Sequence, residues 1–203
     1  MSQAQSRSFA DPLGGPTVTR DHHGTDVAAM EREAISVLER VPEAKWDGTA
    51  PVPIDWIVSE MYDLRVQLHD NIASVVGVEL PEGKRLSGLL LEDRGLVLVD
   101  SWEVEKWPNR RRFTIAHELG HFILHRKNPD YLASPGGSGL PLVEAEAHAF
   151  AAALLLPAVL FRPAADACGG DWSKLLDPFL TTNAAIERRL KTLGYEVEEK
   201  TEA

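Results

Sequence analysis

Two histidines and a glutamate occur at a spacing typical of a metal site. His117, Glu118 and His121 form H-E-x-x-H within the apolar stretch FTIAHELGHFILH. On a helix, residues four apart differ by about 40° and lie about 6 Å apart along the axis, so both imidazoles project side by side. Zinc binds such nitrogens at about 2.0–2.1 Å. Glu118 is rotated about 100° from His117, which suits a base acting on water better than a ligand.

The same stretch also fits a plain core helix whose histidines are satisfied by hydrogen bonds. Large apolar residues surround the motif, so the helix is expected to be buried. Burying two histidines and a glutamate without partners is costly, and this favours the metal site. The chemistry expected there is peptide hydrolysis. Zinc lowers the pKa of bound water and polarises the carbonyl, and Glu118 takes the proton.

A catalytic zinc site has three protein ligands and one open position, so a third ligand is needed. His125 lies about 12 Å along the axis from His117, too far to share the ion comfortably, so packing or support of a ligand is expected of it. Leu124 and Lys127 stand where the metzincin pattern requires glycine and histidine, which excludes that continuation. The third ligand must therefore come from another part of the chain.

Candidates for the third ligand lie in a second apolar helix, VEAEAHAFAAALLLP, as Glu144, Glu146 and His148. Glu144 shares its helical face with the small and apolar residues three, seven, ten and eleven positions later. Glu146 shares a face only with Phe150 and Leu154. Glu144 is therefore favoured, Glu146 stays open as the alternative, and His148 is the weakest candidate.

Helix and strand patterns surround these motifs. Alternation predicts a strand in LRVQLHD, and LSGLLLEDRGLVLVDSW predicts a hairpin whose loop closes at Gly95. Apolar periodicity predicts helices over residues 26–41, 55–62, 110–125 and 141–156, and two short helices in the last section. Asp26 is expected to cap the first helix, Thr182 or Asn183 to cap the last one, and Gly194 to end it.

The expected fold class is α+β, with a mainly helical zincin-like metallopeptidase body, a small antiparallel sheet and a C-terminal helical segment. The expected division is a disordered tail over 1–25, a metallopeptidase domain over 26–165 and a C-terminal helical segment over 166–203. The tail is polar and rich in glycine and proline, without apolar periodicity.

Composition limits the function classes. The formal net charge of −10 and pI near 5.2 argue against a protein that coats nucleic acid through bulk charge. The single cysteine, Cys168, cannot form an internal disulfide, which fits a reducing compartment. No apolar run is long enough to span a bilayer, and the first residues lack the apolar core of a secretory signal. A cytoplasmic location without a membrane partner is therefore expected.

A resemblance to a known family rests on two motifs together, NRRRFTIAHELGHFILH and EAEAHAFAAALLLP. They resemble the ImmA/IrrE family of metallopeptidases, loosely from about residue 26 to residue 194. The resemblance implies Zn²⁺ held by His117, His121 and Glu144, with Glu118 as catalytic base. Leu156 stands where methionine is common, a packing swap expected to be harmless.

The resemblance also implies a regulatory endopeptidase that cleaves a helix-turn-helix transcriptional repressor in a stress or mobile-element circuit. An extended substrate is expected to pair with a hairpin strand such as residues 96–99. Tyr131 and His125 are candidates for donors to the oxyanion.

Two other functions compete with proteolysis. The first is DNA binding by the helix over 183–193, which would present Arg188, Arg189 and Lys191; the acidic chain and a pairing of Glu187 with Lys191 disfavour it. The second is a zinc-bearing interaction module without turnover. The presence of Glu118 disfavours this second function, because zinc binding alone does not require a glutamate at that position.

Overall fold

The computed structural model describes residues 24–126 and 141–197. The tail as far as residue 23, the SPGGSG loop and Tyr131 lie outside these residues. The longer helices are α1 (Val27–Glu39), α5 (Pro108–Leu124), α7 (Pro141–Leu155), α8 (Ala158–Cys168) and α10 (Asn183–Thr192). The shorter helices are α2 (Ile54–Trp56) with a π-helical turn (Ile57–Met61), α3 (Ile72–Val75), α4 (Ser101–Lys106), two 3-10 turns (Glu92–Arg94, Trp172–Leu175) and α9 (Leu176–Phe179). The strands are β1 (Arg65–His69), β2 (Gly88–Leu91) and β3 (Leu96–Asp100).

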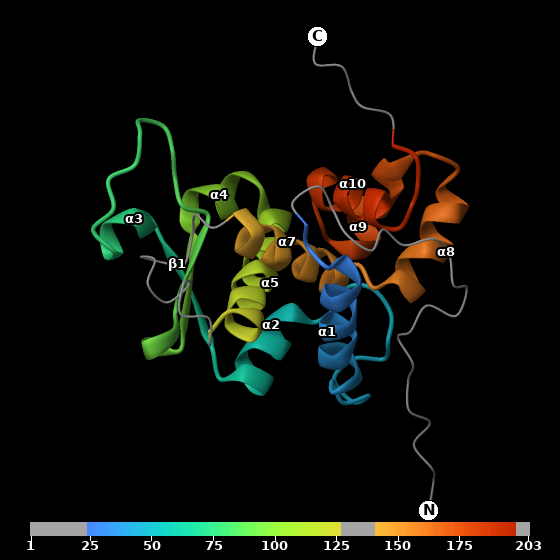
Figure 1. Ribbon diagram of the computed structural model, residues 1–203, viewed down its shortest axis with the longest axis horizontal. Helices are drawn as coiled ribbons and strands as arrows, with labels where there is room; N and C mark the ends of the chain where they lie inside the picture. Colours follow the sequence, from blue (N-terminus) through green and yellow to red (C-terminus); the bar gives the residue numbers. More distant parts are fainter. Residues whose placement is uncertain (1–23, 127–140, 198–203) are drawn as a thin grey trace, which may run out of the picture.

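The α+β architecture is confirmed, and its helices and sheet occupy different parts of the molecule. The sheet and α3 lie at one end, α8, α9 and α10 lie at the other, and α5 and α7 run between them (Figure 1). The Asp26 carboxylate caps α1 by accepting from the Ala29 N–H at 2.9 Å. The Thr182 hydroxyl caps α10 in the same way, at 3.3 Å from the Ala185 nitrogen. Both caps agree with the sequence prediction.

The sheet is mixed, which corrects the expectation of an antiparallel sheet. The strand order is β1-β3-β2. The predicted hairpin is present: β2 pairs antiparallel with β3, and Gly95 closes its turn at φ 55°. β1 instead runs parallel to β3, with Arg65 opposite Leu96. The two parallel strands are joined through α3 and β2, so their relative direction depends on a long crossover that local sequence patterns do not encode.

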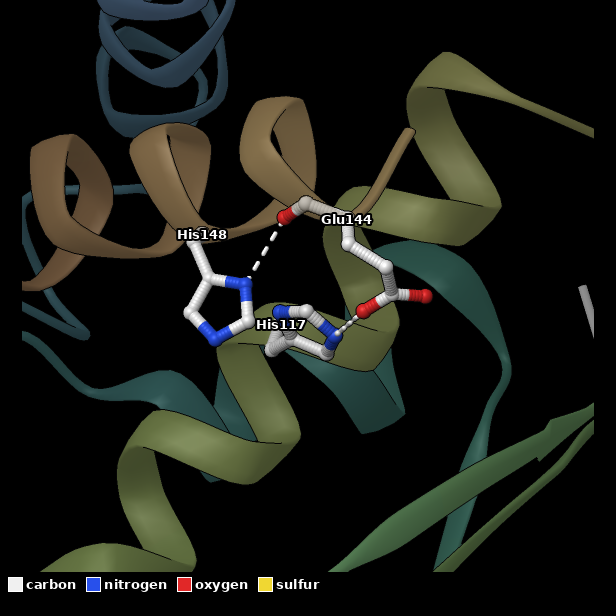
Figure 2. Close-up of side chains that lie close together, drawn as sticks. All are labelled: His117, Glu144 and His148. Atoms are coloured by element: carbon white, nitrogen blue, oxygen red, sulfur yellow. Dashed lines mark hydrogen bonds and ion pairs between the residues drawn. The ribbon is translucent and has the colours of Figure 1, made fainter. Parts of the chain in front are cut away.

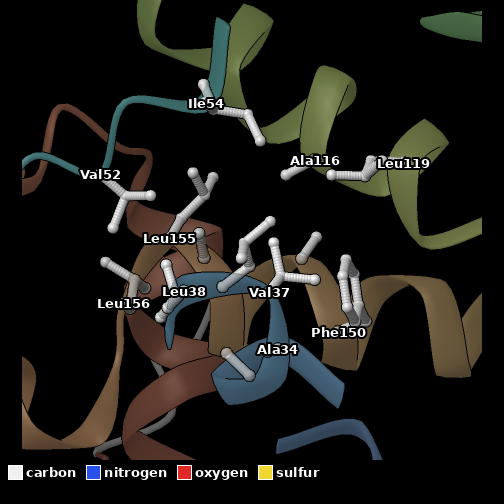
Figure 3. Close-up of a cluster of buried hydrophobic side chains, with 14 of the residues drawn as sticks. Ala34, Val37, Leu38, Val52, Ile54, Ala116, Leu119, Phe150, Leu155 and Leu156 are labelled. Atoms are coloured by element: carbon white, nitrogen blue, oxygen red, sulfur yellow. The ribbon is translucent and has the colours of Figure 1, made fainter. Parts of the chain in front are cut away.

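The two motif helices form the centre of the core. α5 packs mainly on α7, and α1 packs on another side of α7. Their apolar side chains meet in one cluster (Figure 3). Gly120 allows the close approach of α5 to α7, since a Cβ there would lie 3.1 Å from Phe150 Cδ1 and 3.3 Å from the Ala147 carbonyl oxygen. This close packing is what brings the side chains of the two motifs together.

The C-terminal elements share the same core as the body. α8 is absent from the helices that the sequence predicts, because Pro163 lies inside it. α8 still presents a buried face, with Phe161 and Ala165 in the core, and the expected boundary at 165/166 falls within it. The guanidinium of Arg162, also on α8, donates to the Leu193 carbonyl just after α10, at 3.1 Å.

No single helix in the described ranges, 24–126 and 141–197, is long and apolar enough to cross a membrane. Only α7 and α8 taken together meet the length and composition requirement, and they are bent by 74° relative to one another.

Candidate metal centre

Three side chains from the two motif helices converge. His117 and His121 of α5 point the same way, with their Nε2 atoms 3.0 Å apart. Glu144 of α7 places Oε2 at 3.3 Å from His117 Nε2 and Oε1 at 3.5 Å from His121 Nε2. Ligand atoms around a tetrahedral zinc ion, each at about 2.0–2.1 Å from it, lie about 3.4 Å apart. The predicted set therefore has the separations that a zinc ion needs.

The electrostatics of these groups also suit a cation. Burial lowers the pKa of His117 to about 4, although its hydrogen bond with Glu144 acts in the opposite direction. Burial alone would raise the pKa of Glu144, but its polar contacts with His117 and His121 outweigh burial and hold that pKa well below its usual value. A neutral imidazole and an ionised carboxylate are the forms that bind metal.

One oxygen of this group is unsatisfied in the described part of the chain. Glu144 Oε1 is buried and has no hydrogen bond of good geometry, despite lying 3.5 Å from His121 Nε2. A buried carboxylate oxygen without a partner is costly, and a cation at this position would satisfy it. The residues present therefore fit a metal ion.

Glu118 lies beside the metal-binding group and is held by the sheet. Its side chain is buried, and the Leu90 N–H of β2 donates to its carboxylate. Gly88 of the same strand permits this contact, because a Cβ there would stand 2.6 Å from Glu118 Oε1. Burial raises the pKa of Glu118 to about 7, and the nearby Glu144 charge adds to the rise. A carboxylate with a pKa in this range is suited to accept and return a proton near neutral pH.

His148 is a further neighbour of the group. It lies on α7 one turn after Glu144, and Figure 2 shows its ring beside that of His117, with Nδ1 directed to the Glu144 carbonyl oxygen at 2.7 Å. The ring centroids of His148 and His117 are 4.3 Å apart. Ligand atoms of His117, Glu144 and His148 lie within 4.8 Å of one another. An Nδ1–H donated to the carbonyl leaves Nε2 of His148 unprotonated, the form that binds metal, so His148 remains a candidate ligand beside His121.

The matching family covers both helices of this centre. Residues 102–191 match Peptidase_M78, the IrrE N-terminal-like domain. This stretch is similar to that domain over both motif helices. Among solved structures, a Mycobacterium tuberculosis transcriptional regulator has the same fold, with a TM-score of 0.55 and 22% sequence identity. The alignment covers 87% of this chain and 50% of that chain, so this chain spans half of its relative. No curated protein matches the sequence.

The structure has a cavity of about 320 Å³ at the metal-binding group. His117, Glu118 and Glu144 form one wall, and the segment leading into β2 forms the other with apolar side chains such as Val78 and Leu86. A second hollow, of about 450 Å³, lies between the start of α5 and the start of α10. The two hollows share three lining residues, Arg110, Phe113 and His148.

The sheet edge beside the cavity is β2, which corrects the expectation for residues 96–99. Those residues form β3, the central strand, whose two edges are taken by β1 and β2. β2 has β3 on one side, and among the described strands none pairs with its other side. Ser87, Gly88 and Leu89 line the cavity. An extended peptide would therefore pair with β2 rather than with β3.

Sequence reasoning missed the contribution of β2 to the site. The predicted hairpin places Gly88 and Leu90 on a strand, but nothing in the sequence relates them to Glu118, which follows about thirty positions later. A glycine within a strand is the one available signal, because it often marks the close approach of another group. Phe113, in the lead-in to the first motif, lines both hollows, and its aromatic side chain alone does not predict this role.

Proposed function

We infer that this chain is a zinc-dependent endopeptidase, with His117, His121 and Glu144 as ligands and Glu118 as catalytic base. The observation that carries this conclusion is the placement of Glu118. It is buried next to the ligand set, held by the Leu90 N–H, and has a pKa raised to about 7. A zinc site with only a structural role does not require a buried carboxylate beside the ligands, and burying this carboxylate costs stability. When bound, zinc supplies a Lewis acid that polarises the peptide carbonyl and activates water.

The residues around the ligand set then have defined tasks. The Glu118 carboxylate takes a proton from the attacking water and returns it to the leaving amine. β2 aligns an extended substrate through its free edge, next to the ligand set. The cavity wall formed by Val78 and Leu86 accepts an apolar side chain next to the cleaved bond. The second hollow continues past Phe113 and gives the chain on the other side of that bond a place to lie.

The proposed substrate is a helix-turn-helix transcriptional repressor in a stress or mobile-element circuit, and the proposed location is the cytoplasm. The family match supports a peptidase-like domain. The solved structure with the same fold is named a transcriptional regulator, which supports a regulatory setting. A shared fold at 22% sequence identity does not by itself identify the substrate.

The competing DNA-binding function loses one of its three basic residues. Arg189 does not face solvent: it is 1% exposed and pairs with Glu31 of α1 at 2.5 Å. Arg188, Arg189 and Lys191, within about one turn of α10, were expected to present a basic surface, but Arg189 belongs to the core. Arg188 is exposed. Burial is the main cause that lowers the pKa of His148, and the positive charge of Arg188 lowers it further. Arg188 therefore acts on the cavity side of α10.

The test uses a helix-turn-helix repressor from the same organism as substrate, starting with any that is encoded beside the gene. The zinc-loaded chain is expected to cleave it, and chelation is expected to stop cleavage until zinc is restored. Glu118→Gln keeps the shape of the side chain but cannot take a proton, so this variant should bind zinc and lose cleavage by several orders of magnitude. Cleavage that survives both chelation and Glu118→Gln would reject the proposed function.

A further inference from the structure

His121 is linked through a second histidine to a carboxylate on α7. Its Nδ1 lies 3.2 Å from Nδ1 of His125, and Nε2 of His125 lies 2.9 Å from Glu146 Oε2. Both histidines are nearly inaccessible, at 3% exposure each. The chain of contacts therefore runs from the metal-binding face of α5, through His125 at the end of that helix, to α7.

Proton positions in this chain follow from the role of His121 in the proposed function. If Nε2 of His121 binds the metal, its Nδ1 carries the hydrogen and must donate it. Nδ1 of His125 is then the acceptor, and its Nε2 carries the hydrogen. That Nε2–H donates to the Glu146 carboxylate.

We propose that His125 and Glu146 are positioning residues for the metal centre, which fix the tautomer and ring orientation of His121. This inference rests on the proposed zinc site. It also assigns Glu146, the open alternative for the third ligand, to a different task from Glu144. Neither residue is proposed to touch the substrate.

The first histidine of the motif has no comparable support. Nδ1 of His117 is buried and lacks a hydrogen-bond partner within the described residues. Its ring contacts His148 only face to edge, at 4.3 Å between centroids. His121 is therefore the better-oriented of the two imidazoles. Replacing His125, which supports His121, is therefore expected to weaken metal binding more than replacing a neighbour of His117.

A different reading is that His125 and Glu146 only clamp the end of α5 to α7. The two readings differ in what they change. If the pair only clamps the helices, it stabilises the metal-free fold, and replacing either His125 or Glu146 lowers the stability of the metal-free chain. A positioning pair acts on metal affinity, and its two members act through one route, so their effects do not add.

The experiment measures the zinc dissociation constant of the full chain by competition with a chromophoric chelator, and the melting temperature of the metal-free chain. The variants are His125→Leu, Glu146→Leu and the double variant, with His69→Leu on β1 as matched control. Each single change is expected to weaken zinc binding about 10- to 100-fold. The double variant should lose no more than His125→Leu alone. Glu146→Gln, whose amide oxygen still accepts a hydrogen bond, should recover part of the affinity that Glu146→Leu loses.

Coordination geometry gives a second readout. Cobalt substituted for zinc should show a d–d absorption spectrum altered in His125→Leu and Glu146→Leu, and unaltered in His69→Leu. Zinc affinity within about twofold of the wild type in both single variants would overturn the inference while leaving the zinc site standing. Losses that add in the double variant, or that follow the melting temperature of the metal-free chain, would overturn it as well. A wild-type chain that binds no zinc would remove the inference together with the zinc site on which it rests.

Discussion

Gly88 on β2 lies so close to Glu118 on α5 that any larger residue at position 88 must displace the carboxylate. A Cβ atom there would stand 2.6 Å from Glu118 Oε1 and 2.5 Å from Thr114 Cγ2. The same strand donates the Leu90 N–H to Glu118. The sheet thus sets the position of the proposed base, whereas α5 and α7 set the position of the ligands.

Gly88→Ala should separate these two tasks. Displacing the carboxylate by about 1 Å is expected to lower kcat about 10- to 100-fold, with zinc affinity unchanged. Cleavage rates and zinc titration would be measured together. Ser87→Ala, which removes only a 3.2 Å contact with Arg110, is the control. Full activity in Gly88→Ala would show that the base tolerates this displacement or lies elsewhere.

The identity of the third ligand can be decided by stoichiometry. Glu144→Ala removes the carboxylate that lies 3.3 Å from His117 and should abolish binding of the single zinc ion. Glu146→Ala should keep one zinc per chain at high protein concentration, with weaker affinity. Metal analysis after dialysis distinguishes the two variants. The reverse pattern would make Glu146 the ligand.

The raised pKa of Glu118 predicts a pH dependence of stability in the metal-free chain. The pKa is about 7 in the folded state and 4.5 in the unfolded state. Between these values the folded chain holds a proton that the unfolded chain gives up, so the contribution is present below pH 4.5 and is lost as pH rises through 7. The difference corresponds to about 3 kcal/mol.

Glu118→Gln should therefore gain stability relative to the wild type as pH rises. Denaturant unfolding of both metal-free proteins at pH 4.5 and pH 8 would measure the change in their difference. That change should approach about 3 kcal/mol in favour of the variant. An equal difference at the two pH values would mean that the Glu118 pKa is not raised.

The ion pair between Arg189 and Glu31 predicts a large effect from a residue far from the site. Arg189→Ala leaves the Glu31 carboxylate, 15% exposed, without its partner and should destabilise the chain by about 3–5 kcal/mol. Arg188→Ala, at an exposed neighbouring position, should change stability by less than about 0.5 kcal/mol. Thermal melts of the two variants provide the comparison. Similar melting temperatures would show that the buried pair contributes little.

The features that the sequence predicts well are those that depend on helical periodicity. The separation of His117 and His121, the inward face of Glu144 and the Asp26 and Thr182 caps all depend on residues within a few positions of one another. Each is found in the structure. Local spacing is enough for such features because one turn of helix determines them.

The features that were missed depend on contacts between distant residues. The direction of β1 relative to β3 is determined by a crossover of more than twenty residues. Arg189 stands next to another arginine and resembles part of a solvated face, but its partner Glu31 lies on α1. Helix α8 contains Pro163, which masks its periodicity. In each case the sequence shows a residue type, whereas tertiary packing decides its surroundings.

The pairing of Glu31 with Arg189 also has a consequence for biosynthesis. The two residues are 158 positions apart, and α7, which carries a proposed ligand, packs against α1 and also contacts α10. A ribosome that adds about 5–20 residues per second needs on the order of 10 to 30 s to reach Arg189 after Glu31 has been made. During that interval the apolar side of α1 has no complete core to join. The apolar side of α1 therefore lacks its full set of packing partners until α10 has been made, and the metal-binding group requires Glu144 of α7 to follow His117 and His121.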